Sequence, residues 1–335
     1  MRRLPNLKDI CAAYLHGRRK TAVFALTSRC NCKCVMCDMH RQAPEEISLT
    51  DAKRVLNTLA RNGFLVAYFT GGEPTLHPDI VDIVSYAGEL GLVTSMTTNG
   101  TPSKALLSRL KDAGLYLLSV SLDHWDPDIC ENIRKYRKIF ERQTDTLRYL
   151  KEIGLRTYAL AYLNPILLRD GVDKLVSFAN DELGVPLGFC YPTNCDANSY
   201  SLGGELAKEE PSNRLGGEVK KLLDLKRSGR QIANLYCYIK DATNFPGKHL
   251  SFHCRGGEDV VYVDWLGDVY PCFLKREKLF NAVRDREPRF LKGVQCDDCL
   301  INCFREPSFL TEMFHPPTLF FREAYRSYSS RQLFK

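Results

Sequence analysis

The chain has 335 residues, of which 44% are hydrophobic and 26% charged, and it carries a formal net charge of +7 at pH 7. This length predicts one large domain and a smaller module, and no apolar run reaches the ~18 residues that a membrane-spanning helix needs. Fourteen cysteines without a secretory leader argue against a disulfide framework and favour metal ligation in a reducing, cytoplasmic compartment.

The first predicted element is a basic amphipathic helix within residues 1–20. This segment has six Lys or Arg against one Asp, and the basic aromatic tail over 311–335 has four against two, so the two ends account for the whole net charge. The apolar side of the helix consists of Leu7, Ile10, Cys11, Tyr14 and Leu15. We expect both ends to pack against the domain; the alternative, contact with an anionic membrane surface, would suit a lipid substrate.

A buried strand over 21–27 leads into a loop with the spacing Cys30-x3-Cys34-x2-Cys37. Three thiolates at this spacing can hold three irons of a [4Fe–4S] cluster and leave the fourth iron without a protein ligand. An iron with an open position can bind and react with a substrate, whereas a fully ligated cluster only passes electrons. Cys32 adds a fourth thiol, so a zinc site is the alternative. With the cluster in place, we expect Cys32 to face away from it.

Helix and strand patterns then alternate along the chain. Ser48 and Asp51 form an S-x-x-D capping signal before the first helical pattern. Five apolar strands each follow a helical pattern, and they span residues 64–70, 92–98, 115–121, 155–163 and 185–191. Such alternation predicts a parallel sheet with right-handed crossovers. Together with the strand over 21–27, it predicts an α/β fold with a partial (β/α)6 TIM-like barrel over 21–195, followed by a connecting helical segment over 196–250.

Polar residues stand where several of these strands end. They are Gly71, Gly72, Glu73 and Pro74 after the second strand, Thr97 and Asn99 at the third, Ser121 and Asp123 at the fourth, and Asn164 at the fifth. Barrel enzymes place their chemistry at the carboxyl ends of the strands, so these residues are candidates for a ligand site. The alternative is that each polar residue caps a turn.

A second group of cysteines follows within residues 251–310. Its members are Cys254, Cys272, Cys296, Cys299 and Cys303. Two short strands, Val260–Asp264 and Val269–Cys272, flank a turn that contains Gly267 and predict a β-hairpin beside these thiols. Four such thiolates can saturate an iron–sulfur cluster, and a structural zinc ribbon is the alternative.

With the Cys30/Cys34/Cys37 loop, the strand before it and the Gly71–Pro74 turn, the chain resembles the radical S-adenosylmethionine (SAM) enzymes. The resemblance implies a partial barrel whose cysteine loop holds a [4Fe–4S] cluster with SAM bound at the open iron. It also implies that the GGEP turn binds the SAM amino group. Met36 stands where the family often has an aromatic residue near the adenine, and Met can cover a ring face.

The same resemblance implies further SAM contacts at the strand ends. The family's ribose and methionine contacts fall there, which makes candidates of Thr97, Asn99, Ser121, Asp123 and Asn164. Arg134 lies where many members carry an arginine that pairs with the SAM carboxylate. Here Arg134 lacks the glycine that usually follows it.

The second cysteine group resembles the SPASM/twitch extension of radical SAM enzymes, a β-hairpin and a short helical part that carry an auxiliary [4Fe–4S] cluster. The resemblance implies one auxiliary cluster, because the group has too few cysteines for the two clusters of a full SPASM module. Cys254, Cys272, Cys296 and Cys299 are its expected ligands, and Cys303 can replace one of the last two.

The predicted function is an enzyme that reductively cleaves SAM to a 5′-deoxyadenosyl radical and abstracts hydrogen from a small molecule, such as a lipid or sugar. The auxiliary cluster would assist electron transfer, and an external reductant such as flavodoxin or ferredoxin would supply electrons. Cys190 or Cys195 at the end of the sixth strand can donate a hydrogen atom to a product radical, although a buried apolar cysteine is the commoner explanation.

Two alternatives remain open at this stage. One is a peptide-modifying maturase of the SPASM type, and the other is a non-enzymatic iron–sulfur or zinc-binding protein. Nucleic acid is not an expected partner, because the basic excess lies at the ends of the chain and no RNA-binding module is recognisable.

Overall fold

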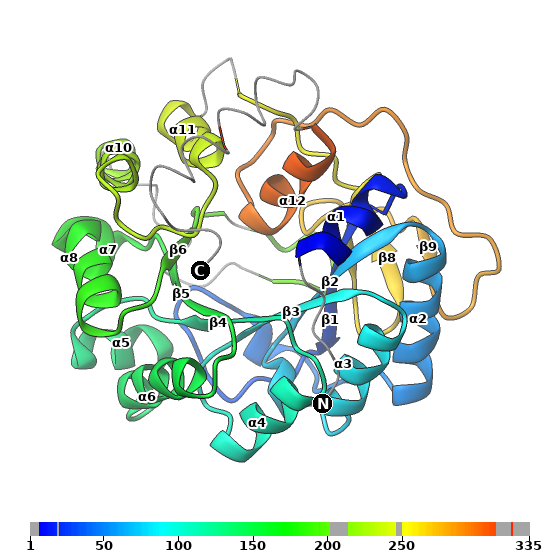
Figure 1. Ribbon diagram of the computed structural model, residues 1–335, viewed down its shortest axis with the longest axis horizontal. Helices are drawn as coiled ribbons and strands as arrows, with labels where there is room; N and C mark the ends of the chain where they lie inside the picture. The colour runs from blue at the N-terminus through cyan, green and yellow to red at the C-terminus, as the bar shows by residue number, and fades with distance from the viewer. Residues whose placement is uncertain are drawn as a thin grey trace.

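The computed structural model describes residues 7–18, 20–193, 195–201, 214–245, 250–312 and 323. Its centre is a sheet of nine strands in the order β6-β5-β4-β3-β2-β1-β7-β8-β9 (Figure 1). The strands are β1 Lys20–Thr27, β2 Phe64–Gly71, β3 Val93–Thr98, β4 Leu117–Ser121, β5 Thr157–Tyr162, β6 Leu187–Cys190, β7 Val260–Val263, β8 Asp268–Tyr270 and β9 Phe280–Asn281. β1 to β6 pair in parallel and in chain order, which confirms the predicted α/β fold with a partial barrel.

Helices connect the parallel strands and cover the outer face of the curved sheet (Figure 1). They are α2 Leu49–Arg61, α3 Ile80–Glu89, α4 Lys104–Asp112, α5 Pro127–Arg134, α6 Ile139–Glu152, α7 Pro165–Asp170 and α8 Val172–Ser177. The predicted cap of α2 is confirmed: the Ser48 hydroxyl accepts a hydrogen bond from the Asp51 backbone N–H at 3.1 Å. Helix α5 is an addition to the predicted pattern, inserted between β4 and α6.

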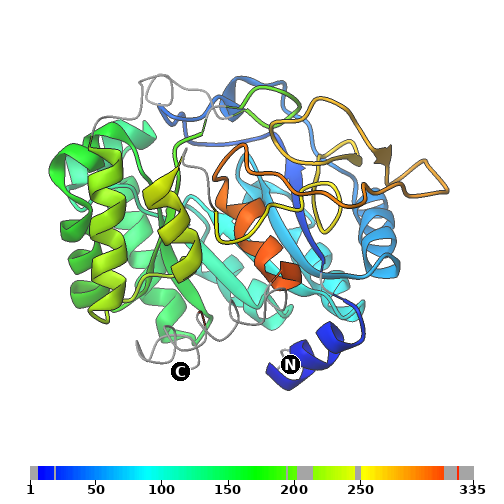
Figure 2. The ribbon, with the colours of Figure 1, turned by 90° about the horizontal axis from the view of Figure 1, so that it is seen from above.

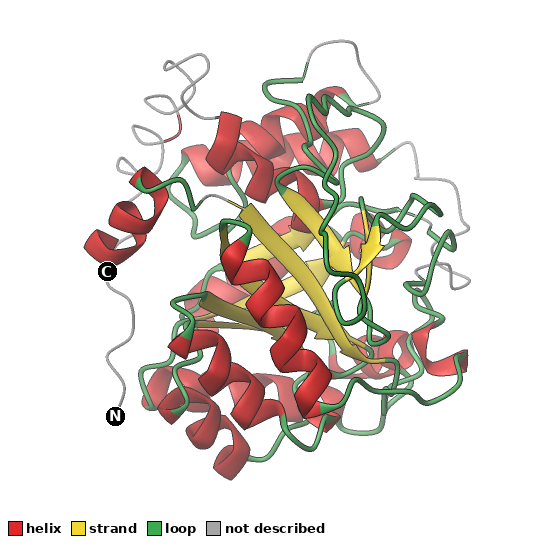
Figure 3. Cartoon of the chain, turned by 90° about the vertical axis from the view of Figure 1, so that its right-hand side faces the viewer, coloured by secondary structure: helices red, strands yellow, loops and turns green. Residues whose placement is uncertain are grey.

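The predicted hairpin in the C-terminal part extends the barrel sheet. β7 pairs in parallel with β1, with Thr21 opposite Val260, and β8 and β9 then add in antiparallel pairs. Helix α12 (Asn302–Glu312) contacts β1, β7 and α11 (Tyr236–Asn244), and Figure 2 shows it beside α11. The predicted boundary at residue 251 therefore divides a continuous sheet. Figure 3 shows the strands in the middle of the molecule with helices around them.

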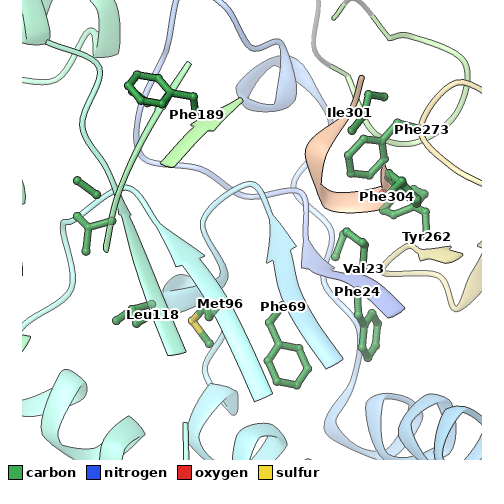
Figure 4. Close-up of a cluster of buried hydrophobic side chains, with 14 of the residues drawn as sticks. Val23, Phe24, Phe69, Met96, Leu118, Phe189, Tyr262, Phe273, Ile301 and Phe304 are labelled. Carbon is green, nitrogen blue, oxygen red and sulfur yellow. The ribbon is translucent and has the colours of Figure 1, made fainter. Parts of the chain in front are cut away.

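The core follows the alternation of side chains along the strands. Phe24 of β1 and Phe69 of β2 face the outer helices with ring centroids 6.2 Å apart (Figure 4). Val23, on the opposite face of β1, points toward Phe304 of α12. Phe304 in turn packs against Phe273 at a centroid distance of 4.8 Å. Full burial of side chains of this size contributes about 2 kcal/mol each, so this packing fixes α12 against the strands.

The ends of the chain are described only in part. Helix α1 spans Leu7–Leu15, and its predicted apolar side is divided, because Tyr14 is buried whereas Leu15 is 76% exposed. In the predicted tail over 311–335, Glu323 accepts hydrogen bonds from the backbone N–H groups of Tyr236 and Cys237. Most of that tail, and residues 1–6, lie outside the described residues. None of the described helices is long and apolar enough to cross a membrane.

Candidate active site

A cavity of about 200 Å³ lies at the carboxyl ends of the parallel strands. It brings together most of the residues predicted to hold the first cluster and SAM: Cys30, Cys34, Met36, Cys37, Gly71, Gly72, Glu73, Thr97, Asn99, Ser121 and Arg134. Pro74, Asp123 and Asn164 do not line it. Three thiols and polar strand ends therefore share one enclosure, as a cluster with a polar ligand on its open iron requires.

The thiols of the cysteine loop interact within this cavity. Hydrogen bonding with Cys32 lowers the pKa of Cys34 to about 7, and the Arg134 guanidinium adds to the effect. Hydrogen bonding with Cys32 also lowers the pKa of Cys30, whereas burial raises the pKa of Cys37. The prediction that Cys32 faces away is wrong, because its side chain is buried and lines the cavity.

The two glycines of the GGEP turn bring β2 against the cysteine loop. A Cβ on Gly71, whose φ is +129°, would lie 2.3 Å from the Thr27 carbonyl oxygen. A Cβ on Gly72 would lie 2.2 Å from the Arg29 carbonyl oxygen. The Gly72 N–H donates to Thr27 O at 2.8 Å, and the Glu73 N–H donates to Arg29 O at 2.7 Å. The glycines are therefore required for close approach to the loop backbone, whatever ligand binds in front of them.

The Glu73 carboxylate is buried and holds the end of β3. It accepts hydrogen bonds from the Thr98 hydroxyl at 2.9 Å and from the Asn99 backbone N–H at 2.6 Å. It also accepts from the backbone N–H and the hydroxyl of Thr75. Burial raises its pKa, and these donors act in the opposite direction. Glu73 thus ties two strand ends together in addition to lining the cavity.

Other hydrogen bonds fix the strand ends around Glu73. The Thr97 hydroxyl lies 2.5 Å from both the Tyr68 hydroxyl and the Ser119 hydroxyl. The Asn99 amide donates to the Asn31 side chain at 2.6 Å and its oxygen accepts from Thr101. The end of β3 and the cysteine loop are therefore joined through side chains as well as backbone.

Arg134 already has two partners beside the cavity. Its Nε donates to Asp123 at 2.5 Å, and its Nη1 donates to the Cys34 sulfur at 3.7 Å. Asp123 is fully buried and also accepts from the Tyr162 N–H, so it positions Arg134 and does not face the cavity. Lys135 occupies the place of the missing glycine and adopts the left-handed conformation, with φ at +50°. The backbone at the end of α5 therefore adopts the left-handed conformation that usually requires glycine, although the residue there is Lys135.

Two further predicted contacts have local structural roles. The Asn164 side chain accepts from the Leu167 N–H at 3.0 Å and caps α7, as the turn-capping alternative proposed. Pro74 begins the short 3-10 helix Pro74–Leu76 and is buried.

Sequence reasoning missed a largely aromatic part of the cavity lining, called the aromatic wall below. It consists of Tyr68, Leu160, Tyr162, Tyr191, Tyr200, Phe273, Ile301 and Asn302. Tyr200 and Phe273 stack with centroids 3.8 Å apart and planes 5° apart. Phe273 directly follows Cys272, and Ile301 lies two residues after Cys299, so the second cysteine group delivers part of this wall. The strand alternation of Tyr68 and Thr70 along β2 is the signal that was available.

Backbone pairing brings two cysteines of the second group together. Cys254 and Cys296 exchange backbone hydrogen bonds at 2.9 and 3.0 Å. Burial raises the pKa of the Cys299 thiol to about 11, and the nearby Cys272 and Cys296 thiols add to this effect. A raised pKa means that deprotonating the buried thiol costs free energy. A metal ligand is held as the thiolate, so binding of a cluster would offset this cost. Among the described side chains, no group of three or more Cys, His, Asp or Glu is arranged around a single metal ion.

Cys303 lies apart from these four. It lines the cavity together with Cys190, while Cys195 is buried outside the lining. Burial is the main cause of the raised pKa of the Cys303 thiol, and the nearby Cys190, Cys195 and Cys299 thiols raise it further. Cys254, Cys272, Cys296 and Cys299 do not line the cavity.

Arg305 stands behind the second thiol group and is completely buried. Its guanidinium pairs with Asp297 at 3.0 Å and with Asp241 of α11 at 3.4 Å, and donates to the Phe252 carbonyl oxygen. These partners flank Cys296 and Cys254 along the chain. The arginine therefore binds the segments that carry two of the thiols to α11.

Comparison with known proteins places this site in a family. The model of the radical SAM superfamily matches residues 24–179. Fe-coproporphyrin III synthase of Methanosarcina barkeri is 32% identical over 293 residues, which span 80% of this chain and 72% of that protein. The chain belongs to the radical SAM superfamily.

Other relatives match over a shorter region. PqqA peptide cyclase of Rhodopseudomonas palustris is 32% identical over 53% of this chain and 49% of its own length. This chain thus spans about half the length of that curated relative. The crystal structure of Streptococcus suis SuiB bound to S-adenosylmethionine superposes with a TM-score of 0.65 at 20% identity, over 83% of this chain and 67% of SuiB. The family predicted from the sequence is confirmed, and the likeness to SuiB at this identity shows a shared fold.

Proposed function

We propose that the protein abstracts a hydrogen atom from a C–H bond of a small molecule held between the cysteine loop and the aromatic wall. Cys30, Cys34 and Cys37 would hold the cluster, which would supply the electron for reductive cleavage of SAM to a 5′-deoxyadenosyl radical. The observation that carries the proposal is the shared cavity, in which Cys30, Cys34 and Cys37 face the ends of β2, β3 and β4. The fit is chemical: thiolates are the protein ligands of such clusters, and three of them leave one iron open.

The chain's own residues position SAM and exclude water. Asn99, Thr97 and Ser121 present polar groups at the strand ends, and Glu73 fixes Asn99 through its backbone N–H. Met36 offers an apolar surface to the adenine. Arg134 stays paired with Asp123 and lies at the cavity edge, where its remaining donors suit a carboxylate. Fixed groups of this kind lower the barrier by holding reactants in reactive geometry.

The aromatic wall favours a substrate with an apolar face. Tyr200 and Phe273 form a stacked pair, and Tyr162 and Ile301 extend the same surface. Lipids and sugars, the predicted classes, both pack on aromatic rings. The match over most of the chain to Fe-coproporphyrin III synthase, whose name refers to a small molecule, also supports a small-molecule substrate.

Four thiols behind that wall support the auxiliary cluster. We infer that Cys254, Cys272, Cys296 and Cys299 saturate it, so it exchanges electrons and does not bind substrate. An external reductant such as flavodoxin or ferredoxin would supply electrons. Contact of the basic chain ends with a membrane surface is a further part of the proposal that liposome pelleting, with and without residues 1–20, would test.

A peptide-modifying enzyme is the second candidate. The observation in its favour is the 32% identity to PqqA peptide cyclase over 185 residues, 53% of this chain. A peptide would enter the same cavity and present one side chain to the aromatic wall.

Anaerobic reconstitution followed by measurement of 5′-deoxyadenosine tests the proposal. The native chain should form it from SAM under reduction, and Cys34→Ala should form none, while Cys237→Ala, which changes a thiol outside the cavity, should match the native chain. Turnover by Cys34→Ala would contradict the proposal. Deuterium transfer to 5′-deoxyadenosine from the small-molecule or the peptide fraction of deuterated cells separates the two candidates.

A further inference from the structure

The outer side of the cysteine loop adjoins the loop that connects α5 to α6. Exposure alternates along the cysteine loop, so Lys33 is exposed while Cys32 and Cys34 on either side of it are buried. The Val35 N–H donates to the carbonyl oxygen of Ile133 in α5 at 2.9 Å and joins the two loops. Lys33 directly precedes a predicted cluster ligand, so a partner that docks on this side reaches the surface next to that ligand.

Cations gather where the two loops meet. Four of them are exposed and are called the basic surface below: Lys33, Lys135, Arg137 and Lys138. Within the described part of the chain, their side chains have no ion-pair partner. Residues 131–142 have five Lys or Arg against two Glu, whereas the chain without its two ends is balanced in charge. Val35 and Tyr136 add partly buried apolar side chains to the same region. An apolar centre with a charged rim is typical of protein interfaces.

The α5–α6 loop presents these cations from a fixed and unfavourable backbone. Lys135 and Lys138, with φ at +50° and +58°, are the only described residues other than glycine with a positive φ. The Glu131 carbonyl oxygen accepts from the Lys135 N–H, and the Glu131 carboxylate accepts from the Lys138 N–H, both at 2.7 Å. Left-handed backbone costs an L-residue stability, and strain of this kind concentrates at functional sites.

The charge and the position together indicate the partner. Reductive cleavage of SAM in the proposed function consumes one electron, which must reach the first cluster from outside the chain. A cationic surface beside a predicted ligand of that cluster complements a carrier with an acidic surface. Complementary charge speeds association, and the small interfaces typical of electron-transfer partners allow rapid release.

We propose that the basic surface docks an acidic protein that carries single electrons, such as a flavodoxin, and that the first cluster is reduced from this side. One electron leaves the carrier, which is oxidised, and enters the cluster, which is reduced; no bond and no proton is transferred in this step. The inference rests on the proposed function, because it requires the cluster on Cys30, Cys34 and Cys37.

Binding of reduced flavodoxin to the reconstituted full-length enzyme tests it. The variant Arg137→Glu/Lys138→Glu reverses two cations outside the cysteine loop. The matched control, Arg284→Glu/Arg286→Glu, makes the same change of charge at two exposed arginines after β9, which Figure 1 shows on the other side of the molecule.

At low ionic strength, Arg137→Glu/Lys138→Glu should bind flavodoxin about tenfold more weakly than the native enzyme, and the control should stay within about twofold. The difference should shrink at high salt, because salt screens exposed charges. Formation of 5′-deoxyadenosine should fall in parallel when flavodoxin is the reductant. It should equal the native rate in both variants with dithionite, a small reductant that needs no docking surface.

Four results overturn the inference. Equal weakening in the two variants would mean that only total charge matters, and weakening in the control alone would place the carrier near β9. A slower reaction with dithionite in Arg137→Glu/Lys138→Glu would mean that these residues act within the enzyme. Unchanged flavodoxin binding with weaker binding to phosphatidylserine vesicles would assign the surface to a membrane. If the native enzyme forms no 5′-deoxyadenosine with dithionite, the proposed function fails, while the binding measurement still decides whether the carrier docks here.

Discussion

The two thiol sites of this protein are built in opposite ways. The first takes its three predicted ligands from one loop over 30–37, which faces a cavity and is held by backbone contacts to the GGEP turn. The four predicted ligands of the second lie on segments spread over 254–299, with a β-bridge between Cys254 and Cys296 and the buried Arg305 paired with Asp297. The first site is local in sequence and open to ligands; the second exists only once the fold has formed.

The largest expected effect comes from an alanine in place of a glycine at the first site. The new Cβ in Gly72→Ala would lie 2.2 Å from the Arg29 carbonyl oxygen, so β2 and the cysteine loop must separate. We expect loss of more than about 4 kcal/mol or failure to load the first cluster.

Gly256→Ala is the matched change at the second site. Its Cβ would lie 3.1 Å from the Pro271 carbonyl oxygen and 3.6 Å from the Cys254 sulfur, which small shifts relieve. We expect a loss of about 1 kcal/mol with both clusters retained. Iron content and chemical denaturation of the two variants decide the comparison, and similar losses would contradict it.

Arg305→Met tests how the second site depends on the fold. The variant leaves Asp241 buried without its cation and frees the segment around Asp297, at a cost of about 3–5 kcal/mol. The first cluster loop does not touch Arg305, so a SAM-sensitive signal should persist while iron is lost from the second site. Retention of all iron would show that the four thiols hold together without the arginine.

A third prediction concerns α12, which lies between the two sites. Burial raises the pKa of Glu306 to about 7, while the carboxylate accepts from the Leu235 N–H at 2.7 Å. The folded protein therefore binds a proton more tightly than the unfolded chain, so stability falls as pH rises from about 4.5 to 7. Between pH 5 and pH 7.5, the free energy of unfolding of Glu306→Gln should decrease by about 2 kcal/mol less than that of the native protein, as measured by chemical denaturation at both pH values. An unchanged pH slope would refute the assignment.

The smallest effect concerns the end of α5 beside the first site. Lys135 follows Arg134 with φ at +50°, a conformation that glycine adopts at less cost. Lys135→Gly should raise the free energy of unfolding by about 0.5 kcal/mol, and Lys33→Gly, in the exposed part of the cysteine loop, is a control without that relief. A destabilised Lys135→Gly protein would mean that the lysine side chain contributes more than its backbone strain costs.

The contrast between the sites also explains what the sequence could predict. Hydrophobic periodicity and punctuating residues predicted β1 to β6 and the cap of α2, because these depend on neighbours in the chain. The loop thiols and the GGEP turn were predicted for the same reason. The two-residue strand β9 and the pairing of β7 with β1 depend on contacts between distant segments and were missed. Helix α5 was also missed, although Asp126 caps it and Pro127 begins it, which is a local signal.

Side-chain direction was the second limit. No pattern shows that Cys32 turns inward, since this depends on the hydrogen bonds of Asn31 to residues of another strand end. Likewise, Tyr200 and Phe273 are remote in sequence and become one surface only through packing. The close approach of Gly71 to Thr27 and of Gly72 to Arg29 likewise joins segments that are distant in the sequence, and the GGEP motif alone did not predict it.

The central claim is that the first cluster has an iron that SAM can occupy. The most direct measurement is the electron paramagnetic resonance spectrum of the reduced, reconstituted enzyme before and after addition of SAM. The account predicts that one of two cluster signals changes shape with SAM and that this signal is missing in Cys34→Ala. A spectrum that is the same with and without SAM, or a protein that binds only zinc, would contradict it.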